Sequence, residues 1–320
     1  MSQKGIDKLL DKIKQNMSER KFYESHQLWR TIYFRLLKQE RYVELAEILL
    51  DGATRLIDEK QFQSGSDLAL LLVEVLSKHK FDDQNEVEKW ICHVAGIIEK
   101  IDANVVERET LIVRTIKWTT AETNQKNPTL HTLLARIMLK EENYEQARYH
   151  SLLSKNGYLC AKILIQHSTK AYNSEIDMII VQVVLNLLIL KDKSTAAETF
   201  EYYTKYHPKI RTSQPPYRTP LLNFAYFLLN IIDDKKLQAF TTLCELYRTA
   251  LTRDSEYEKK LEKIGTFYFN APVKKQDMRS GGIFGDLFNQ LFQELENDSD
   301  SDSNMQFSSS SVLSSNVDLD

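Results

Sequence analysis

The sequence predicts an all-α protein, a right-handed α-solenoid of tetratricopeptide-like antiparallel helix hairpins. Turn-forming residues are scarce, with 9 glycines and 6 prolines among 320 residues, and every proline lies at or after Pro128. A β-sandwich or β-barrel would need many more tight turns. Residue types that favour helix are abundant, and apolar residues recur every three or four positions along most of the chain.

The helical spacing starts near the N-terminus. Apolar residues at 9–13 predict a first helix, and those at 22–37 and 42–49 predict a second and a third. A fourth periodic run covers residues 68–76 and directly follows Asp67, a residue type that suits a helix start. We therefore expect the fourth helix to begin at Asp67.

The same periodicity predicts ten further helices, and the short segments between them favour antiparallel neighbours. They are expected at 84–100, 107–118, 129–140, 144–154, 157–169, 174–190, 194–207, 219–232, 236–250 and 255–270.

A loose internal repeat supports the solenoid. Three segments place an aromatic residue, an acid and a small or apolar residue after a polar turn, as the second helix of a tetratricopeptide hairpin does. They are Arg20-Lys-Phe-Tyr-Glu-Ser-His, Glu40-Arg-Tyr-Val-Glu-Leu-Ala and Glu142-Asn-Tyr-Glu-Gln-Ala-Arg. Because the period is not a regular 34 residues, the sequence indicates a degenerate solenoid in which each hairpin buries its face on its neighbours.

Two internal segments interrupt the pattern. Residues 119–128 are polar and are expected to form a loop. Residues 208–220 contain four prolines, which is too many for a helix. With Ile210 and Tyr217 on either side of a turn, this second segment could form a small β-hairpin that projects from the solenoid.

These features divide the chain into four parts. Residues 1–150 and 151–280 would form the N-terminal and C-terminal halves of the solenoid. Residues 281–295 combine a glycine hinge with an apolar stripe at helical spacing, and residues 296–320 form an acidic, serine-rich tail that is expected to be disordered.

Charge is distributed unevenly. The net charge is -3, but seven acids and no Lys or Arg lie in residues 294–320, whereas the first 41 residues hold ten Lys and Arg against five acids. This asymmetry suggests charged partners, yet the basic excess is too small for a nucleic-acid site.

Cysteine usage and hydropathy place the protein in the cytosol. The three cysteines, Cys92, Cys160 and Cys244, are far apart and form no CxxC pair, which is typical of free thiols in a reducing compartment. The most apolar stretch, residues 178–190, is shorter than the roughly 20 residues that span a bilayer. We expect a buried helix there and no direct membrane insertion.

No catalytic, metal or cofactor site is expected. The chain lacks GxxxxGK[ST], GxGxxG and HExxH. The adjacent pair Cys92-His93 has no second pair at ligand spacing and would diverge by about 100° on a helix. The sequence therefore favours a protein that holds other proteins over an enzyme.

The first two predicted helices offer a candidate contact surface. Arginine interspersed with aromatic residues is the composition of protein-interface hot spots, although an ordinary charged face explains the spacing as well. The residues are Lys8, Lys12, Arg20, Arg30 and Arg35, with Tyr23 and His26 between them. Asp67 and Glu74, two helical turns apart, form either a second contact or a solvated face.

Several blocks, in order, resemble the Golgi-to-ER traffic protein 4 family. The first is Phe22-Tyr-Glu-Ser-His-Gln-Leu-Trp-Arg-Thr-Ile-Tyr-Phe-Arg, similar to the family's signature second helix. Ser64-Gly-Ser-Asp-Leu, Leu130-His, Glu142-Asn-Tyr-Glu-Gln-Ala-Arg-Tyr-His and Ile264-Gly-Thr-Phe-Tyr-Phe-Asn-Ala-Pro-Val-Lys-Lys-Gln follow. The resemblance covers about residues 3–292, with small departures such as Phe22 and Ser25 in place of Tyr and Ala.

The resemblance implies a cytosolic α-solenoid scaffold for delivery of tail-anchored membrane proteins to the endoplasmic reticulum. Its N-terminal half would dock the targeting ATPase, and its C-terminal half a ubiquitin-like-domain adaptor or, in animal systems, also a Bag-family chaperone scaffold. The resemblance places Tyr23, His26, Arg30 and Arg35 at the ATPase-docking surface.

It also implies two further roles. Asp67 and Glu74 would form a second, regulatory contact that restrains ATP hydrolysis. The segment around Pro215, Pro216 and Tyr217 would belong to the adaptor-binding end.

Affinity purification separates this hypothesis from its main alternative, a helical-repeat subunit of another large complex of the proteasome-lid, coat or nuclear-pore kind. We expect the tagged protein to recover a targeting ATPase and a ubiquitin-like adaptor. Recovery of a stoichiometric set of other solenoid subunits would favour the alternative.

Overall fold

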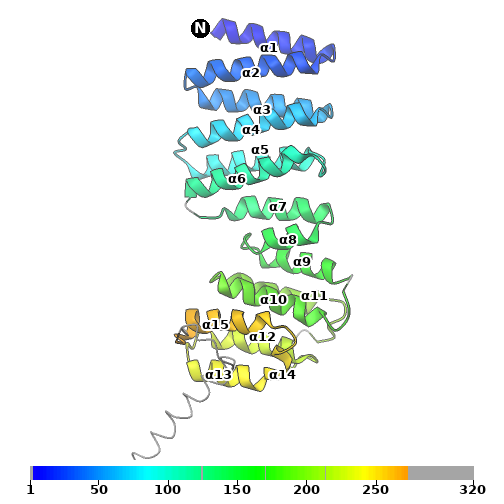
Figure 1. Ribbon diagram of the computed structural model, residues 1–320, viewed down its shortest axis with the longest axis vertical. Coiled ribbons are helices and arrows are strands. Elements are labelled where there is room, and N and C mark those ends of the chain that lie inside the picture. The colour runs from blue at the N-terminus through cyan, green and yellow to red at the C-terminus, as the bar shows by residue number, and fades with distance from the viewer. Residues whose placement is uncertain (1–2, 124, 170, 213, 273–320) are drawn as a thin grey trace, which may run out of the picture. The chain divides into compact units, whose positions relative to one another are not determined.

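A computed structural model describes residues 3–272, apart from 124, 170 and 213, and these residues form fifteen helices and no strand (Figure 1). The helices are α1 Gln3–Ser18, α2 Phe22–Lys38, α3 Tyr42–Asp58, α4 Phe62–Lys78, α5 Gln84–Lys100, α6 Val106–Thr123, α7 Pro128–Lys140, α8 Tyr144–Ser151, α9 Gly157–Ser168, α10 Ile176–Ile189, α11 Lys193–Tyr206, α12 Pro220–Ile231, α13 Leu237–Leu246, α14 Arg248–Leu251 and α15 Glu256–Phe269. The all-α prediction is confirmed.

The chain divides into two compact units. The first comprises residues 1–187 and 192–214, and the second comprises residues 188–191 and 215–320. Residue 150, where the sequence analysis divided the solenoid into halves, lies within α8 of the first unit. The assignment of separate docking functions to two halves stays a prediction.

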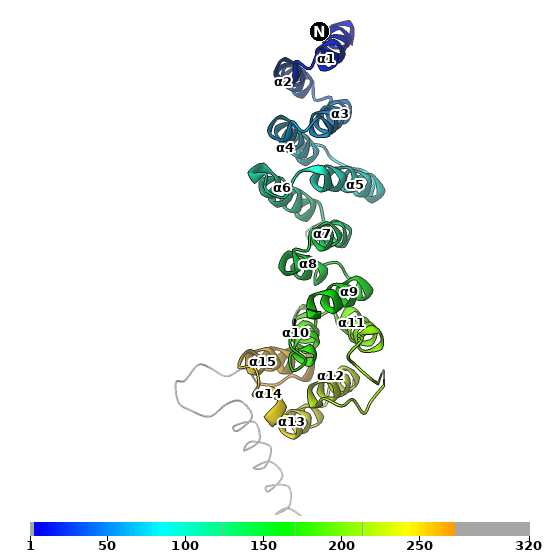
Figure 2. The same ribbon diagram turned by 90° about the vertical axis from the view of Figure 1, so that its right-hand side faces the viewer.

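Helices of the first unit form two layers (Figure 2). Helices α2, α4, α6 and α8 follow one another along one layer, and α1, α3, α5, α7, α9 and α11 along the other. Most helices pack against a chain neighbour, as α3 does with α4 and α7 with α8, and several also pack against the next helix of their own layer, as α2 does with α4, α4 with α6, and α9 with α11. This is the arrangement expected of stacked helix hairpins.

Each of the first three helices is followed by a residue whose backbone lies in the left-handed region. Arg20, Glu40 and Lys60 have φ of 59°, 55° and 61°, and they stand 20 residues apart. After each, the next backbone N–H donates to a carbonyl five residues earlier, as Gln61 does to Leu56 at 2.8 Å. This pattern is a Schellman motif. The helices α2, α3 and α4 each begin with an aromatic residue, two positions after the left-handed residue.

Residues about 40 apart lie on neighbouring helices of the same layer at several places in the first unit, and their polar groups pair there. For the first four helices this spacing equals two 20-residue steps. Lys100 Nζ donates to Asp58 at 2.9 Å, Lys140 Nζ to Glu99 at 2.8 Å, and the Gly157 N–H to Glu198 at 2.9 Å. The residues predicted to form the docking site are brought together by the same spacing of about 40 residues.

Close helix approach depends on two glycines. A Cβ atom on Gly52 would lie 2.7 Å from the Trp29 ring, and one on Gly65 would lie 2.5 Å from Ile57 Cγ1. Trp29 and Leu68, on either side of Gly52, are fully buried. The glycines therefore let α2, α3 and α4 share one continuous core.

The expected β-hairpin at 208–220 is wrong, since no strand occurs among the described residues of that segment. The Asn223 side chain, at the start of α12, accepts from the Tyr217 N–H at 2.7 Å and donates to the Tyr217 carbonyl at 2.8 Å. Both polar groups of the Tyr217 backbone are thereby satisfied without a partner strand, and proline nitrogens supply no donor for one.

Two helix boundaries also differ from expectation. Helix α6 continues to Thr123, through part of the predicted loop at 119–128, because Trp118 and Thr119 are buried and the Thr119 hydroxyl donates to the Thr115 carbonyl. Helix α4 begins at Phe62 after the left-handed Lys60, so Asp67 lies within the helix rather than at its start.

The second unit has its own aromatic core. Phe240 of α13 stacks on Phe269 of α15 with ring centroids 4.6 Å apart. The Tyr268 hydroxyl donates to the Leu188 carbonyl at 3.0 Å, which ties residues 188–191 to α15. The hinge, amphipathic helix and tail predicted at 281–320 lie outside the described residues.

A pair of glycine substitutions tests the packing. Gly65→Ala should lower the free energy of unfolding by about 1–3 kcal/mol, because its Cβ would overlap Ile57 in a filled core. Gly96→Ala, where nothing lies within 4 Å of the new atom, should raise it by about 0.5–1 kcal/mol. Urea denaturation followed by circular dichroism measures both, and equal effects would refute the close approach.

Candidate docking site on helices α2 and α4

Three predicted site residues meet across two helices. His26 Nε2 on α2 lies 2.8 Å from Asp67 Oδ2 on α4, and Arg30 Nη1 donates to both Asp67 oxygens at 3.2 and 3.3 Å. His26 is largely buried, whereas Arg30 and Asp67 are each a little over a third exposed. These residues were predicted to form two separate contacts, but the structure joins them in one cluster.

The cluster holds Asp67 in its charged form. The hydrogen bond from His26 lowers the pKa of the Asp67 carboxyl, and the nearby charge of Arg30 lowers it further against the opposing effect of burial. The charged form of Asp67 is therefore favoured, and it partly neutralises the charge of Arg30.

Glu74 lies two helical turns further along α4 and is also hydrogen-bonded. Lys78 Nζ donates to it at 2.7 Å and is the main reason that the pKa of Glu74 is lowered; the Tyr33 hydroxyl contributes as well. Burial and the bond to Glu74 raise the pKa of Tyr33 to about 12. Tyr33 thus connects α2 to α4 at a second point.

The exposed side of α2 carries two large aromatic residues. Tyr23 is 71% exposed and Phe34 is 60% exposed. They are eleven residues apart, about three helical turns, and Arg30 lies between them on the same stripe. Together they form what we call the α2 stripe: Tyr23, Arg30 and Phe34.

Phe34 was not among the sequence-predicted residues, although its spacing from Tyr23 and Arg30 would have placed it on this stripe. Arg35 was among them, but it follows His26 by nine residues and so lies about 180° around the helix. It is half-buried on the flank of α2 away from Asp67. Among the predicted docking residues, Arg35 therefore stands apart from the cluster.

At the predicted adaptor end, the three named residues differ in exposure. Pro216 is exposed and Pro215 half-buried, whereas Tyr217 is only 6% exposed and its ring packs near Tyr226 at 6.4 Å. The Tyr217 side chain contributes to the core of the second unit. Of these three residues, the prolines are the ones open to direct contact with a partner.

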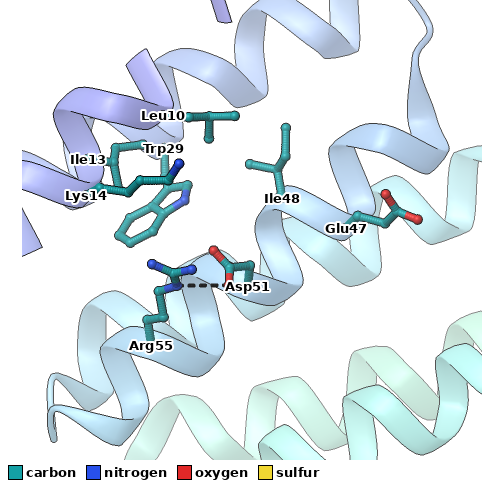
Figure 3. Close-up of a pocket in the computed structure, with 8 residues that line it drawn as sticks. All are labelled: Leu10, Ile13, Lys14, Trp29, Glu47, Ile48, Asp51 and Arg55. Atoms are coloured by element: carbon teal, nitrogen blue, oxygen red, sulfur yellow. Dashed lines mark hydrogen bonds and ion pairs between the residues drawn. The ribbon is translucent and has the colours of Figure 1, made fainter. Parts of the chain in front are cut away.

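A small pocket lies on the other side of α2 (Figure 3). It has a volume of about 230 Å³, and its lining residues come from α1, α2 and α3: Leu10, Ile13, Lys14, Trp29, Glu47, Ile48, Asp51 and Arg55. Trp29 lies between the α1 residues and α3, and the Asp51–Arg55 ion pair, 2.8 Å, stands beside it. The pocket is smaller than typical ligand sites of about 300–1,000 Å³.

Comparison with known proteins decides the family. A sequence model described as Golgi to ER traffic protein 4 matches residues 39–292. The Golgi to ER traffic protein 4 homolog of Oryzias latipes is 37% identical over 285 residues, covering 88% of this chain and 87% of the relative. The human homolog is 38% identical over 285 residues, covering 88% and 86%. The chain belongs to the Golgi to ER traffic protein 4 family.

The fold agrees with a solved structure. The crystal structure of C. therm. Get4 superposes with a TM-score of 0.76 at 20% sequence identity, covering 90% of this chain and 96% of that one. This likeness supports the helical solenoid. Among the described residues of this family member, no helix is both long and apolar enough to cross a membrane.

One buried pair in this family member has the composition of a nucleophile and its base. Ser168 Oγ lies 2.8 Å from His207 Nε2. However, His207 Nδ1 accepts from the Lys209 N–H at 3.1 Å, so the neutral ring carries its proton on Nε2 and donates to the serine. The Ser168 hydroxyl itself donates to the Ile165 carbonyl. The pair is therefore arranged for packing, since a general base would need Nε2 as an acceptor.

A second histidine pair joins α7 and α8. His131 Nδ1 and His150 Nδ1 lie 2.9 Å apart, and the two residues are 2% and 3% exposed. One neutral ring must donate and the other accept. Burial lowers the pKa of each to about 4, and for His131 the neighbouring His150 adds to the effect. No group of three or more metal-binding side chains occurs in the described part of the chain.

The buried histidine pair predicts that the folded protein loses stability in acid. In the unfolded chain a histidine has a pKa near 6.5, so below that pH the unfolded state binds protons that the folded pair excludes. Stability should be complete above pH 6.5 and fall by about 1.4 kcal/mol per pH unit per histidine as pH decreases toward 4. Urea denaturation at pH 7.5, 6.0 and 5.0 measures the slope.

The double variant His131→Leu/His150→Leu serves as the comparison, since it removes both partners of the hydrogen bond and leaves neither unsatisfied. It should lose most of the slope, whereas His93→Gln, at an exposed position, should keep it. A wild-type slope retained in the double variant would contradict the assignment.

Proposed function

We propose that the protein is a cytosolic scaffold that joins the targeting ATPase of the tail-anchored pathway to a ubiquitin-like adaptor, and so supports delivery of tail-anchored membrane proteins to the endoplasmic reticulum. Family membership supports a role in Golgi–ER traffic. The observation that carries the finer proposal is the α2 stripe, an arginine between two exposed aromatic residues beside the His26–Asp67 contact.

The chemistry of the stripe supports docking on α2. Tyr23 and Phe34 offer apolar area that is already ordered on a helix, and aromatic residues with arginine dominate binding energy at protein interfaces. Arg30 and Arg35 present positive charge on two flanks of the same helix. A matching ATPase surface would be acidic around an apolar centre, and its binding would weaken with salt.

Asp67 would act as a regulator through Arg30. In the free protein its carboxylate holds the guanidinium at 3.2 Å. A partner carboxylate that approached Arg30 would compete with Asp67, and Asp67 itself would repel acidic residues placed over α4. Asp67 and Glu74 are therefore suited to limit how an acidic partner seats on the two helices.

The adaptor would bind the C-terminal part of the chain, where Pro216 is exposed beside the buried Tyr217. A Bag-family chaperone scaffold is a further partner proposed for the same end. These assignments rest on the family resemblance, and they need no catalysis, metal or cofactor.

Charge reversal tests the ATPase assignment. Arg30→Glu/Arg35→Glu should weaken binding of the purified targeting ATPase at least tenfold and leave adaptor binding unchanged, because it opposes an acidic surface on α2. Arg35→Glu alone should weaken binding by a smaller factor, without placing a second acid beside Asp67.

The control is Lys89→Glu/Arg136→Glu, which also reverses two charges, both of them exposed, on α5 and α7 of the opposite layer. It should leave both affinities unchanged. Biolayer interferometry at two salt concentrations gives the affinities. Unchanged ATPase binding by both α2 variants, at wild-type melting temperature, would refute the docking assignment.

Truncation of Phe34 tests the aromatic contribution of the α2 stripe to ATPase binding. Phe34→Ala removes a largely exposed ring, so stability should change by less than about 0.5 kcal/mol, while ATPase affinity should fall about fivefold or more. Val43→Ala on α3, also an exposed apolar residue, is the control. If Phe34→Ala and Val43→Ala bind the ATPase alike, the ring lies outside the interface.

A further inference from the structure

Three tyrosines form a continuous aromatic surface across α9 and α11. The Tyr158 ring on α9 meets Tyr202 on α11 edge-on with centroids 5.3 Å apart, and Tyr202 stacks on Tyr206 at 5.8 Å with an interplanar angle of 16°. Tyr158 is 52% exposed and Tyr206 is 56% exposed. We call these three residues the tyrosine platform.

Core packing does not account for the platform. The buried face of α11 is supplied by other residues, among them Phe200 and Tyr203, whose hydroxyl donates to the Ile176 carbonyl at 2.9 Å. Tyr158 and Tyr206 each leave about half of their residue surface exposed. Tyrosines gathered in this way at the surface are typical of protein interfaces, where they supply contact area at a low cost in conformational entropy.

The backbone beneath the platform is held rigidly. The Gly157 N–H, at the start of α9, donates to Glu198 Oε2 on α11 at 2.9 Å, and a Cβ at Gly157 would lie 2.6 Å from the Glu198 side chain. The absence of a side chain at Gly157 therefore allows the close approach that sets Tyr158 against Tyr202. At the other end of α11, His207 is fixed by Ser168. A surface ordered before binding loses little entropy when a partner arrives.

Exposed lysines outnumber exposed acids in the segments that carry the platform. Lys205 Nζ lies 5.4 Å from the centre of the Tyr206 ring. Lys155, Lys162 and Lys209 are also exposed within one helical turn or so of a platform tyrosine in sequence. The exposed acids in the same segments are Glu201 and Glu198, and the Glu198 carboxylate already accepts from Gly157. The charge complement of this surface is acidic.

We propose that the tyrosine platform docks an acidic segment of a partner protein, with aliphatic side chains laid on the rings and carboxylates directed to the neighbouring lysines. The platform belongs to the layer of α9 and α11, whereas the α2 stripe belongs to the layer of α2 and α4 (Figure 2). The tyrosine platform is thus a different surface from the proposed ATPase site, and its test does not depend on that proposed function.

Fluorescence anisotropy with three labelled peptides tests the proposal on the full-length protein. The probes are equal-length peptides of alternating Glu and Leu, of alternating Glu and Ser, and of alternating Lys and Leu. We expect the Glu–Leu peptide to bind at least tenfold more tightly than either of the others, because only it supplies both negative charge and aliphatic side chains. Equal binding of all three would overturn the proposal.

Variants locate the binding. Tyr158→Ala/Tyr206→Ala should weaken binding of the Glu–Leu peptide at least tenfold, and Lys205→Glu should weaken its binding severalfold. Tyr172→Ala removes another exposed tyrosine, outside the platform, and should have no effect. Thermal melting confirms that each variant folds.

Two results would contradict the assignment. One is unchanged peptide binding in the folded Tyr158→Ala/Tyr206→Ala variant. The other is concentration-dependent dimerisation of the wild-type protein that this variant abolishes, measured by sedimentation velocity, because a second copy would then be the occupant. If the double variant loses its fold, Tyr206→Ala alone replaces it with the same expectations.

Discussion

The first hairpins of this protein depend on a residue held in the left-handed region at the end of each helix. Arg20, Glu40 and Lys60 take this conformation, although each has a side chain that costs about 1 kcal/mol or more there. The Schellman bonds that follow satisfy the last carbonyls of the helix. Because the step between these turns is 20 residues, every second helix returns to the same layer about 40 residues later, and that spacing brings His26 to Asp67.

Much of the fold could be predicted from residue spacing. The helices expected at 84–100, 157–169 and 255–270 agree with the structure to within a residue or two. The turns were harder, because a left-handed lysine, Lys60, precedes α4 and its sequence gives no sign of that conformation. The start of α4 was misplaced because Asp67 was taken as the residue that begins the helix. The segment at 208–220 was misjudged because the bond between Asn223 and the Tyr217 backbone is a pairing of side chain with main chain that no periodicity indicates.

The candidate site was predictable in its residues but not in its connections. His26, Arg30 and Asp67 were each identified, yet Arg30 and Asp67 were assigned to different contacts, since their pairing depends on the 40-residue register. Phe34 was missed because an aromatic residue in a periodic helix is usually part of the core. Arg35 shares the charge of Arg30 but not its face, because five residues turn an α-helix by about 140°.

The two surfaces proposed here use the two layers differently, one with an arginine held by an internal acid and one with tyrosines accompanied by lysines. The claim on which the functional account depends most is that α2 and α4 form the ATPase-docking face. Hydrogen–deuterium exchange of the full-length protein with and without the targeting ATPase tests it directly. We expect the ATPase to slow exchange in residues 22–38 and 62–78 while leaving residues 84–100 unchanged. Slower exchange confined to residues 220–269 would contradict the claim.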